Sequence, residues 1–212
     1  MQLPQQLLDS LSDVKGFDKE AFEQVHASGK QITSIRINPA KPPTKQRSFQ
    51  IGPPASNSRL LTPDSQLPTP VPWSQYGYYL HKRPSFTFDP LFHAGCYYVQ
   101  EASSMFLEQA LKQTVDLSKP LKVLDLSAAP GGKSTHIQSL ISKESLLVSN
   151  EVIRSRANIL KDNIIKWGCN NVMVTNNDPK DFAKLENYFD LIVVDAPGSR
   201  SEERRVGKEC RS

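Results

Sequence analysis

Between residues 121 and 195, short apolar runs alternate with segments whose apolar residues recur at helical spacing. The runs LKVLDL, SLLVSN, NVMVT and FDLIVVDAP are typical of strands. Strands separated by helices pair in parallel, because each helix carries the chain back along the sheet in a right-handed crossover. The continuous apolar stretch LIVV is typical of a buried strand in such a sheet. We therefore predict an α/β fold built on a parallel sheet.

Two helices are predicted in more detail. VIRSRANILKDNIIKWG places Ile153, Ala157, Leu160 and Ile164 on one stripe and ends at Gly168. QEASSMFLEQAL, at 100–111, predicts an amphipathic helix. The residues that we expect on its apolar face are Ala102, Met105, Phe106, Gln109 and Ala110.

The N-terminal part differs from the core in its predicted elements and in its proline content. Residues 1–38 predict two short helices and a strand, with Ile35 and Ile37 on one face of the strand. Residues 39–72 carry nine of the sixteen prolines, which excludes a regular helix or a central strand. We expect a small α+β domain over 1–90, a core over 91–198, and a non-native tail over 199–212.

Composition excludes several classes of protein. No apolar run approaches the roughly 18 residues of a membrane span, and the N-terminus has no secretion signal. Three widely spaced cysteines, Cys96, Cys169 and Cys210, form neither a metal pattern nor a disulfide framework. We expect a cytoplasmic protein without a metal. The net charge of +4 is compatible with a polyanionic partner.

Each predicted strand of the core ends in an acidic or glycine-rich group. Asp125 is followed by the loop SAAPGGKS, where glycines let backbone N–H groups approach a ligand at a helix N-terminus. Glu151 lies 20 positions after Gly131, the usual place of a ribose-binding acid. Asn177-Asp178 suits an adenine amino group, and the last strand ends at Asp195. The alternative is that Glu151 and Asp178 only cap helices.

Three classes of nucleoside-containing ligand are alternatives for the site that these strand ends predict. A hydride-transfer enzyme would carry G-x-G-x-x-G, which is absent. Ser127–Ser134 differs at one position from the P-loop pattern, but that position is the first glycine of the phosphate cradle, and Pro130 interrupts the loop. S-adenosylmethionine has a ribose and an adenine but no phosphate, and it fits the pattern best.

DLSAAPGGKSTH followed by FDLIVVDAP resembles the NOL1/NOP2/Sun family of RNA cytosine-5 methyltransferases. TSIRINPAK, VPWSQYGYYL and HAGCYYVQEASSM resemble the N-terminal part of its bacterial 16S rRNA members. The resemblance covers about residues 4–197. It implies a Rossmann-like, S-adenosylmethionine-dependent core, here with its first four strands only, behind a small RNA-contacting domain. The cofactor positions that it implies are Ser127, Ala128, Ala129, Pro130, Gly131, Gly132, Lys133, Glu151, Asp178 and Asp195.

The sequence also departs from the family. The family reads D-A-P-C after the last strand and uses that cysteine to release the product, whereas this chain has Gly198. The second family cysteine, which attacks cytosine C6, would lie beyond residue 212. We therefore assign no catalytic residue and expect this chain to be inactive. We also expect an uncovered LIVV edge that favours aggregation.

Several basic residues are candidates for RNA phosphate contact. Arg36 lies in a segment that the family places near its substrate; the others are His81, Lys82, Arg83, Arg154 and Arg156. The alternative for each is an ordinary solvated surface. Tyr97 and Tyr98 could stack on a base, but we expect core packing. From the resemblance we expect rRNA of the 16S type as the partner, and we expect the protein to be a monomer. A non-catalytic RNA- or cofactor-binding module and a P-loop nucleotide hydrolase remain alternatives.

Overall fold

The computed structural model describes residues 3–29, 32–42 and 68–196. It divides into two compact units, residues 1–33 and 34–212. The first contains two helices, α1 (Gln5–Leu11) and α2 (Lys19–Ala27), as the sequence predicts. Asp18 caps α2, because its carboxylate accepts a hydrogen bond from the Ala21 backbone N–H at 3.0 Å. Phe17 and Phe22 pack edge to face beside this cap.

The second unit contains two sheets. The smaller, antiparallel sheet has the order β2-β3-β1-β4. Its strands and the short helices near them are β1 (Thr33–Ile37), β2 (Thr69–Pro70), β3 (Gly77–Leu80), η1 (Phe86–Phe88), α3 (Pro90–His93) and β4 (Tyr97–Val99). Ile35, Ile37 and Tyr97 form its core, and the Tyr97 hydroxyl donates to Asp89. The core packing expected for Tyr97 is therefore present.

The larger sheet is parallel, with the order β7-β6-β5-β8. Its elements are η2 (Ser103–Phe106), α4 (Leu107–Thr114), β5 (Lys122–Asp125), α5 (Gly132–Leu140), β6 (Leu146–Asn150), α6 (Arg154–Trp167), β7 (Val172–Thr175), η3 (Pro179–Lys184) and β8 (Leu191–Val193). This is the predicted α/β core with four parallel strands. None of the helices among the described residues is both long and apolar enough to span a membrane.

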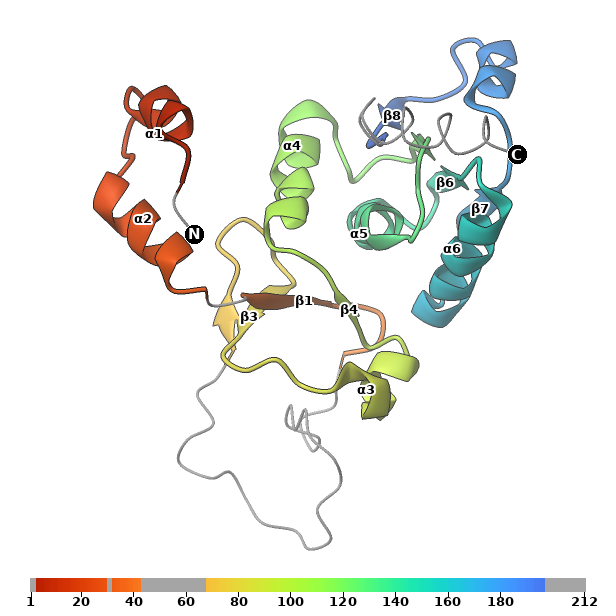
Figure 1. The fold of residues 1–212 in the computed structure, drawn as a ribbon. Helices are drawn as coiled ribbons and strands as arrows, with labels where there is room; N and C mark the ends of the chain where they lie inside the picture. The colour runs from red at the N-terminus through yellow and green to blue at the C-terminus, as the bar shows by residue number, and fades with distance from the viewer. Residues whose placement is uncertain (1–2, 30–31, 43–67, 197–212) are drawn as a thin grey trace, which may run out of the picture. The chain divides into compact units, whose positions relative to one another are not determined.

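The helices of the core pack on one face of this sheet, where α5 lies between α4 and α6 (Figure 1). Ile137 of α5 and Leu111 of α4 pack against Val123 and Leu147. Leu160 and Ile164 of α6 pack against the loop residues Ala128 and Ala129. The stripe predicted for α6 is confirmed for Ala157, Leu160 and Ile164, which are all buried.

The opposite face of the sheet is covered less completely. Ile192 on β8 and Met173 on β7 lie on that face, in register with Leu124 and Val148, and are 55% and 54% exposed. The described β8 is therefore not buried as its apolar run predicts, and its exposure agrees with the uncovered LIVV edge that we expect. Among the described residues, β8 pairs only with β5 and packs against helices on one side only.

The face predicted for the helix at 100–111 is wrong in part: Met105 is buried as expected, but Phe106 and Ala110 are exposed. Its first part forms the 3₁₀ helix η2, and the α-helix begins only at Leu107. This break changes which residues point inward, so that Met105, Glu108 and Leu111 are buried, whereas Phe106 is exposed.

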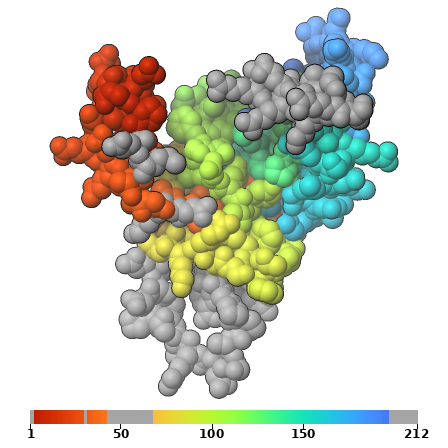
Figure 2. Space-filling model, viewed as in Figure 1, coloured from red at the N-terminus to blue at the C-terminus, as the bar shows by residue number. Residues whose placement is uncertain are grey.

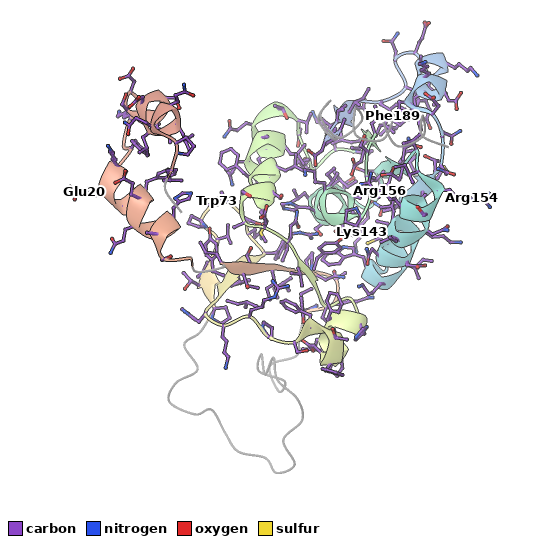
Figure 3. All side chains as sticks on the ribbon, viewed as in Figure 1. Glu20, Trp73, Lys143, Arg154, Arg156 and Phe189 are labelled. Carbon is purple, nitrogen blue, oxygen red and sulfur yellow. The ribbon has the colours of Figure 1, made fainter. Side chains whose placement is uncertain are left out.

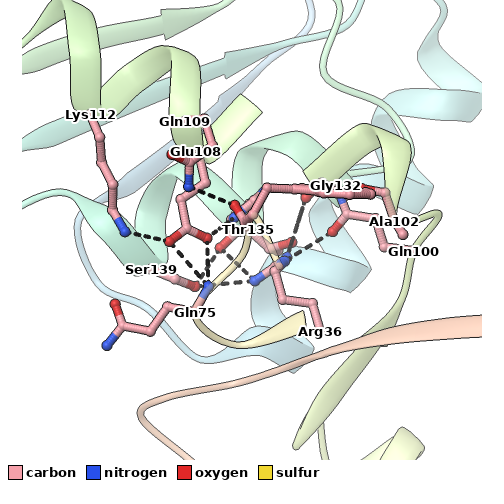
Figure 4. Close-up of polar contacts among 12 residues, drawn as sticks. Arg36, Gln75, Gln100, Ala102, Glu108, Gln109, Lys112, Gly132, Thr135 and Ser139 are labelled. Carbon is pink, nitrogen blue, oxygen red and sulfur yellow. Dashed lines mark hydrogen bonds and ion pairs between the residues drawn. The ribbon is translucent and has the colours of Figure 1, made fainter. Parts of the chain in front are cut away.

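Glu108 is a fully buried acid on α4 with several hydrogen-bond donors. Both of its oxygens accept from the Gln75 backbone N–H, and Lys112 and His136 contact one oxygen each (Figure 4). Burial alone would raise the pKa of Glu108, but the hydrogen bonds more than offset it and hold the pKa at about 2. Burial lowers the pKa of His136. A carboxylate beside a neutral imidazole therefore joins α4, α5 and the turn before β3.

Arg36 on β1 is buried completely, which contradicts both sequence expectations for it. Its guanidinium donates to Gln100, to Ser139 and to Thr135 Oγ1, the last at 2.7 Å (Figure 4). It also lies over the Trp167 ring, 4.6 Å from the centroid. β1 is a strand of the small sheet, and its Arg36 side chain contacts α5 through Thr135 and α6 through Trp167. Arg36 therefore joins the small sheet to the core helices and is not accessible to solvent or RNA.

The segment after Arg36 holds the C-terminal end of α6. Asn38 Nδ2 donates to the Trp167 carbonyl at 2.9 Å, and Lys41 Nζ donates to the Lys166 carbonyl at 2.8 Å. Both bonds satisfy carbonyls that the helix itself leaves free, and the Lys41 charge favours the negative end of the helix dipole. A Cβ on Gly95 would lie 2.0 Å from the Lys166 oxygen, so only glycine permits this approach.

We expect Ile137→Ala to lower the free energy of unfolding by about 2–5 kcal/mol, because Ile137 is 0% exposed between the sheet and α4 and the substitution leaves a cavity. Ile165→Ala is the matched control on the same kind of residue in α6, the helix coloured cyan in Figure 2, because Ile165 is 64% exposed. It should change the free energy by about 0.5 kcal/mol or less. Urea unfolding measures both values, and equal effects would contradict this packing.

Candidate functional site

The carboxyl ends of the four parallel strands meet at one edge of the large sheet. Asp125 is in register with Ser149 and Val193, and Asn150 is in register with Thr175. The acids predicted for the pocket come after these strand ends. Glu151 follows β6 directly, whereas Asp178 and Asp195 lie in the segments just beyond β7 and β8. The structure therefore places all of them at the edge where parallel sheets bind ligands.

Asn150 joins three of these strand ends. Its Oδ1 accepts from the Asn177 backbone N–H at 3.0 Å and from the Thr175 hydroxyl at 2.9 Å. Its Nδ2 donates to the carbonyls of Leu126 and Asn177. Asn150 is a site residue that was not predicted, although an amide at the end of an apolar strand is a signal that the sequence contains.

The loop after β5 turns its carbonyl groups toward side chains of β4 and α6. Arg156 donates to the Ala129 carbonyl at 2.8 Å, while Asn163 at 2.8 Å and the Tyr98 hydroxyl at 3.2 Å donate to the Pro130 carbonyl. Gly131 follows with φ of +109°, a backbone conformation that favours glycine. Among the described residues no side chain caps α5, so its first N–H groups lack a side-chain acceptor.

The basic residues fall into two groups. Arg156 is part of the site, because it contacts Glu151 and the Ala129 carbonyl, so its predicted phosphate contact is not supported. Arg154, also on α6, is exposed (Figure 3). His81, Lys82 and Arg83 are exposed as well, in agreement with a solvated surface.

Of the two acids, Asp178 makes the contact of the capping alternative, whereas α6 begins after Ile153 without a side-chain cap. Glu151 is buried, and its Oε1 accepts from the Ile153 backbone N–H at 3.0 Å. Its Oε2 accepts no hydrogen bond and lies 3.3 Å from Arg156 Nη1. Asp178 is exposed and caps η3 through the Lys180 N–H at 2.9 Å. Of these two acids, Glu151 is therefore the one that combines burial with an acceptor oxygen that no hydrogen bond uses.

Asp125 is a second buried acid with an unused oxygen. Its Oδ2 accepts from the Ser134 hydroxyl at 2.7 Å, whereas its Oδ1 has no hydrogen-bond partner among the described residues. Burial raises the pKa of Asp125 to about 6, against the opposing effect of the Ser134 hydrogen bond.

A pocket of about 210 Å³ opens beside this loop. It is lined by Tyr98, Val99, Gln100, Ser104, Ser127, Ala128, Ala129, Pro130, Gly132, Lys133 and Asp195. Lys133 forms an ion pair with Asp195 across it. Tyr98 thus faces a pocket as well as the core. A larger groove of about 590 Å³ lies along α6 and β7 but contains none of the predicted cofactor residues.

The described cysteines do not form a reactive centre. Cys96 and Cys169 are half-buried and free, and burial raises the pKa of Cys169 to about 11, which keeps it a thiol near neutral pH. Over 3–29, 32–42 and 68–196, no group of His, Cys, Asp and Glu side chains is arranged to hold a metal ion. Gly198 and Cys210 lie outside the described residues.

Two family models match the chain. The one described as the N-terminal domain of 16S rRNA methyltransferase RsmF matches residues 3–102, and the one described as 16S rRNA methyltransferase RsmB/F matches residues 112–209. Ribosomal RNA small subunit methyltransferase F of Pectobacterium atrosepticum is 33% identical over 205 residues, which cover 93% of this chain and 40% of the relative. For its namesake in Escherichia coli O157:H7 the identity is 35%, over 78% of this chain and 33% of the relative.

The chain therefore spans about two fifths of the length of the first of these curated relatives. Among solved structures, a methyltransferase homolog from Pyrococcus horikoshii has a TM-score of 0.62 and 26% identity, over 93% of this chain and 64% of its own. The protein PH0851 has a TM-score of 0.68 and 23% identity, over 92% of this chain and 41% of its own, which shows the fold.

We expect Asp125→Asn to remove a pH dependence of stability. Because the folded-state pKa of Asp125, about 6, exceeds its usual 3.8, the folded protein binds the proton more tightly. This contribution is fully present below about pH 4 and is lost as the pH rises through about 6, a change of about 3 kcal/mol. Urea unfolding between pH 4 and 7 should show this slope in the wild type relative to Asp125→Asn. Parallel profiles would contradict the buried, unneutralised carboxyl.

Proposed function

Since the chain belongs to the RsmB/F family of 16S rRNA methyltransferases, we propose that it binds S-adenosylmethionine and serves the methylation of cytosine C5 in 16S rRNA. One observation carries the proposal. The strand ends bring a glycine loop, an uncapped helix N-terminus and the buried acid Glu151 to one edge, and Glu151 keeps an oxygen without a hydrogen bond. That oxygen suits a ribose hydroxyl, which needs an acceptor.

The side chains around the pocket have distinct parts in this proposal. Glu151 accepts from the ribose hydroxyls, and Asp178 accepts from the adenine amino group. The loop Ser127–Lys133 offers backbone N–H groups, because Arg156, Asn163 and Tyr98 hold two of its carbonyls. Asp195 and Lys133, which form an ion pair, complete the proposed cofactor positions. When bound, the cofactor supplies an electrophilic methyl group on its sulfonium.

The proposed partner is rRNA of the 16S type, which the relatives' names support. We propose that the protein acts in the cytoplasm, as a monomer and without a metal ion. The N-terminal 90 residues would contact RNA and residues 91–198 would bind the cofactor.

The chain lacks the residue that the family uses for product release. The family uses a cysteine where this sequence has Gly198, and glycine has no thiol to assist it. We therefore propose that this chain binds the cofactor and does not turn over. The P-loop alternative is weaker, because a nucleoside triphosphate would need Lys133 for its phosphates, whereas Lys133 pairs with Asp195.

Calorimetric titration with S-adenosylhomocysteine tests the proposal. The wild type should bind it saturably and should not bind ATP. Glu151→Gln should weaken binding by about tenfold to a hundredfold, since a neutral amide replaces a charged acceptor of the ribose hydroxyls. Its Oε1 can still accept from the Ile153 N–H, so the fold should persist.

Glu144→Gln is the matched control, since Glu144 is exposed in the turn before β6, at the opposite edge of the sheet. It should leave the affinity unchanged. Failure of the wild type to bind S-adenosylhomocysteine, or equal affinities for the two variants, would contradict the proposed site.

A further inference from the structure

Gln100 has a buried donor without a partner. The side chain is 7% exposed, and its Oε1 accepts from Arg36 Nε at 2.9 Å. This bond determines the orientation of the amide, because a guanidinium can only donate. The remaining group, Nε2, has no hydrogen-bond partner among the described residues. An unpaired buried donor is costly, so an acceptor from a ligand would stabilise it.

The unpaired Nε2 is next to the pocket. Gln100 lines the 210 Å³ pocket together with Gly132, the first residue of α5. A Cβ placed on Gly132 would lie 3.8 Å from Gln100 Nε2, so the donor sits beside the uncapped start of this helix. Two independent features, an unpaired amide and a helix N-terminus, therefore meet at one wall of the pocket.

The electrostatic environment of this wall favours an anion. Arg36 is completely buried behind Gln100, and its hydrogen-bond partners are neutral groups of Gln100, Gly132, Thr135 and Ser139. None of these hydrogen-bond partners is negatively charged, and the N-terminal end of α5 adds a partial positive charge. The buried Glu108 carboxylate interacts with Arg36 electrostatically, but it does not line this pocket. Asp195, the one acid that lines the pocket, is paired with Lys133.

We propose that Gln100 Nε2 and the first turn of α5 bind the carboxylate of the amino-acid half of the cofactor, with Arg36 as the positioning residue that aims the amide. This inference rests on the proposed function. The adenosine half belongs at Glu151 and Asp178, beyond β6 and β7, whereas this pocket lies beside β5 and β8. A cofactor that spans the sheet edge in this direction therefore brings its carboxylate to Gln100.

The test compares two ligands that differ at this end. S-adenosylhomocysteine carries the carboxylate, whereas 5′-methylthioadenosine lacks the amino-acid group. Gln100→Leu removes the donor and should weaken binding of S-adenosylhomocysteine by about tenfold to a hundredfold, as for a hydrogen bond to a charged group. The affinity for methylthioadenosine should stay within about twofold. Gln113→Leu, at an exposed position of α4, should change neither affinity.

Gln100→Glu separates ligand binding from structure. A carboxylate can still accept from Arg36, so the melting temperature should be kept or raised, yet it repels the ligand's carboxylate. It should therefore weaken S-adenosylhomocysteine at least as strongly as Gln100→Leu and spare methylthioadenosine.

Three results would overturn this inference while leaving the proposed function intact. They are an unchanged affinity of Gln100→Glu for S-adenosylhomocysteine, an equal loss for both ligands, and a loss confined to binding of an RNA oligonucleotide. A wild type that binds neither adenosine ligand would overturn the proposed function itself.

Discussion

The buried guanidinium of Arg36 is the contact on which the arrangement of the second unit depends. It donates to β4 through Gln100 and to α5 through Thr135 and Ser139, and it stacks on Trp167 at the end of α6. A charge enclosed in this way is tolerated only when its donors are satisfied, and burial lowers the pKa of Arg36 to about 9. Because α5 starts at the glycine loop, the contact that joins the two sheets also positions the pocket.

The glycine loop after β5 is held by hydrogen bonds from residues that are distant in the sequence. Asn150 joins β5, β6 and β7 at their ends, and Arg156 and Asn163 hold the loop carbonyls from α6. Hydrogen-bonding capacity is consequently left over at the sheet edge, on Glu151 and Asp125 as acceptors and on Gln100 as a donor. Unpaired buried groups also occur elsewhere among the described residues, on Thr33, Ser74, His136 and Ser149. The proposed ligand therefore rests on the position of Glu151, Asp125 and Gln100 close to the glycine loop, and not on their lack of a partner alone.

The parallel core could be predicted from the sequence, because its strands are short apolar runs whereas its helices are longer and carry apolar residues at helical spacing. In α6, for example, the predicted apolar stripe through Leu160 is buried. Arg36 could not be placed, since a lone arginine in a strand looks exposed unless both faces are known to be covered. The burial of Glu108 was missed for the same reason: besides Lys112 on its own helix, its donors are Gln75 and His136, 33 and 28 positions away. The acids at the strand ends follow from the pattern alone, but which of their oxygens remain unpaired depends on the packing of α6.

A crystal structure of the chain with S-adenosylhomocysteine tests the central claim most directly. This account predicts ribose hydroxyls within hydrogen-bonding distance of Glu151, adenine toward Asp178, and the carboxylate between Gln100 and the first turn of α5. Density for the ligand in the groove along α6 and β7, or a ligand with its ribose away from Glu151, would contradict it.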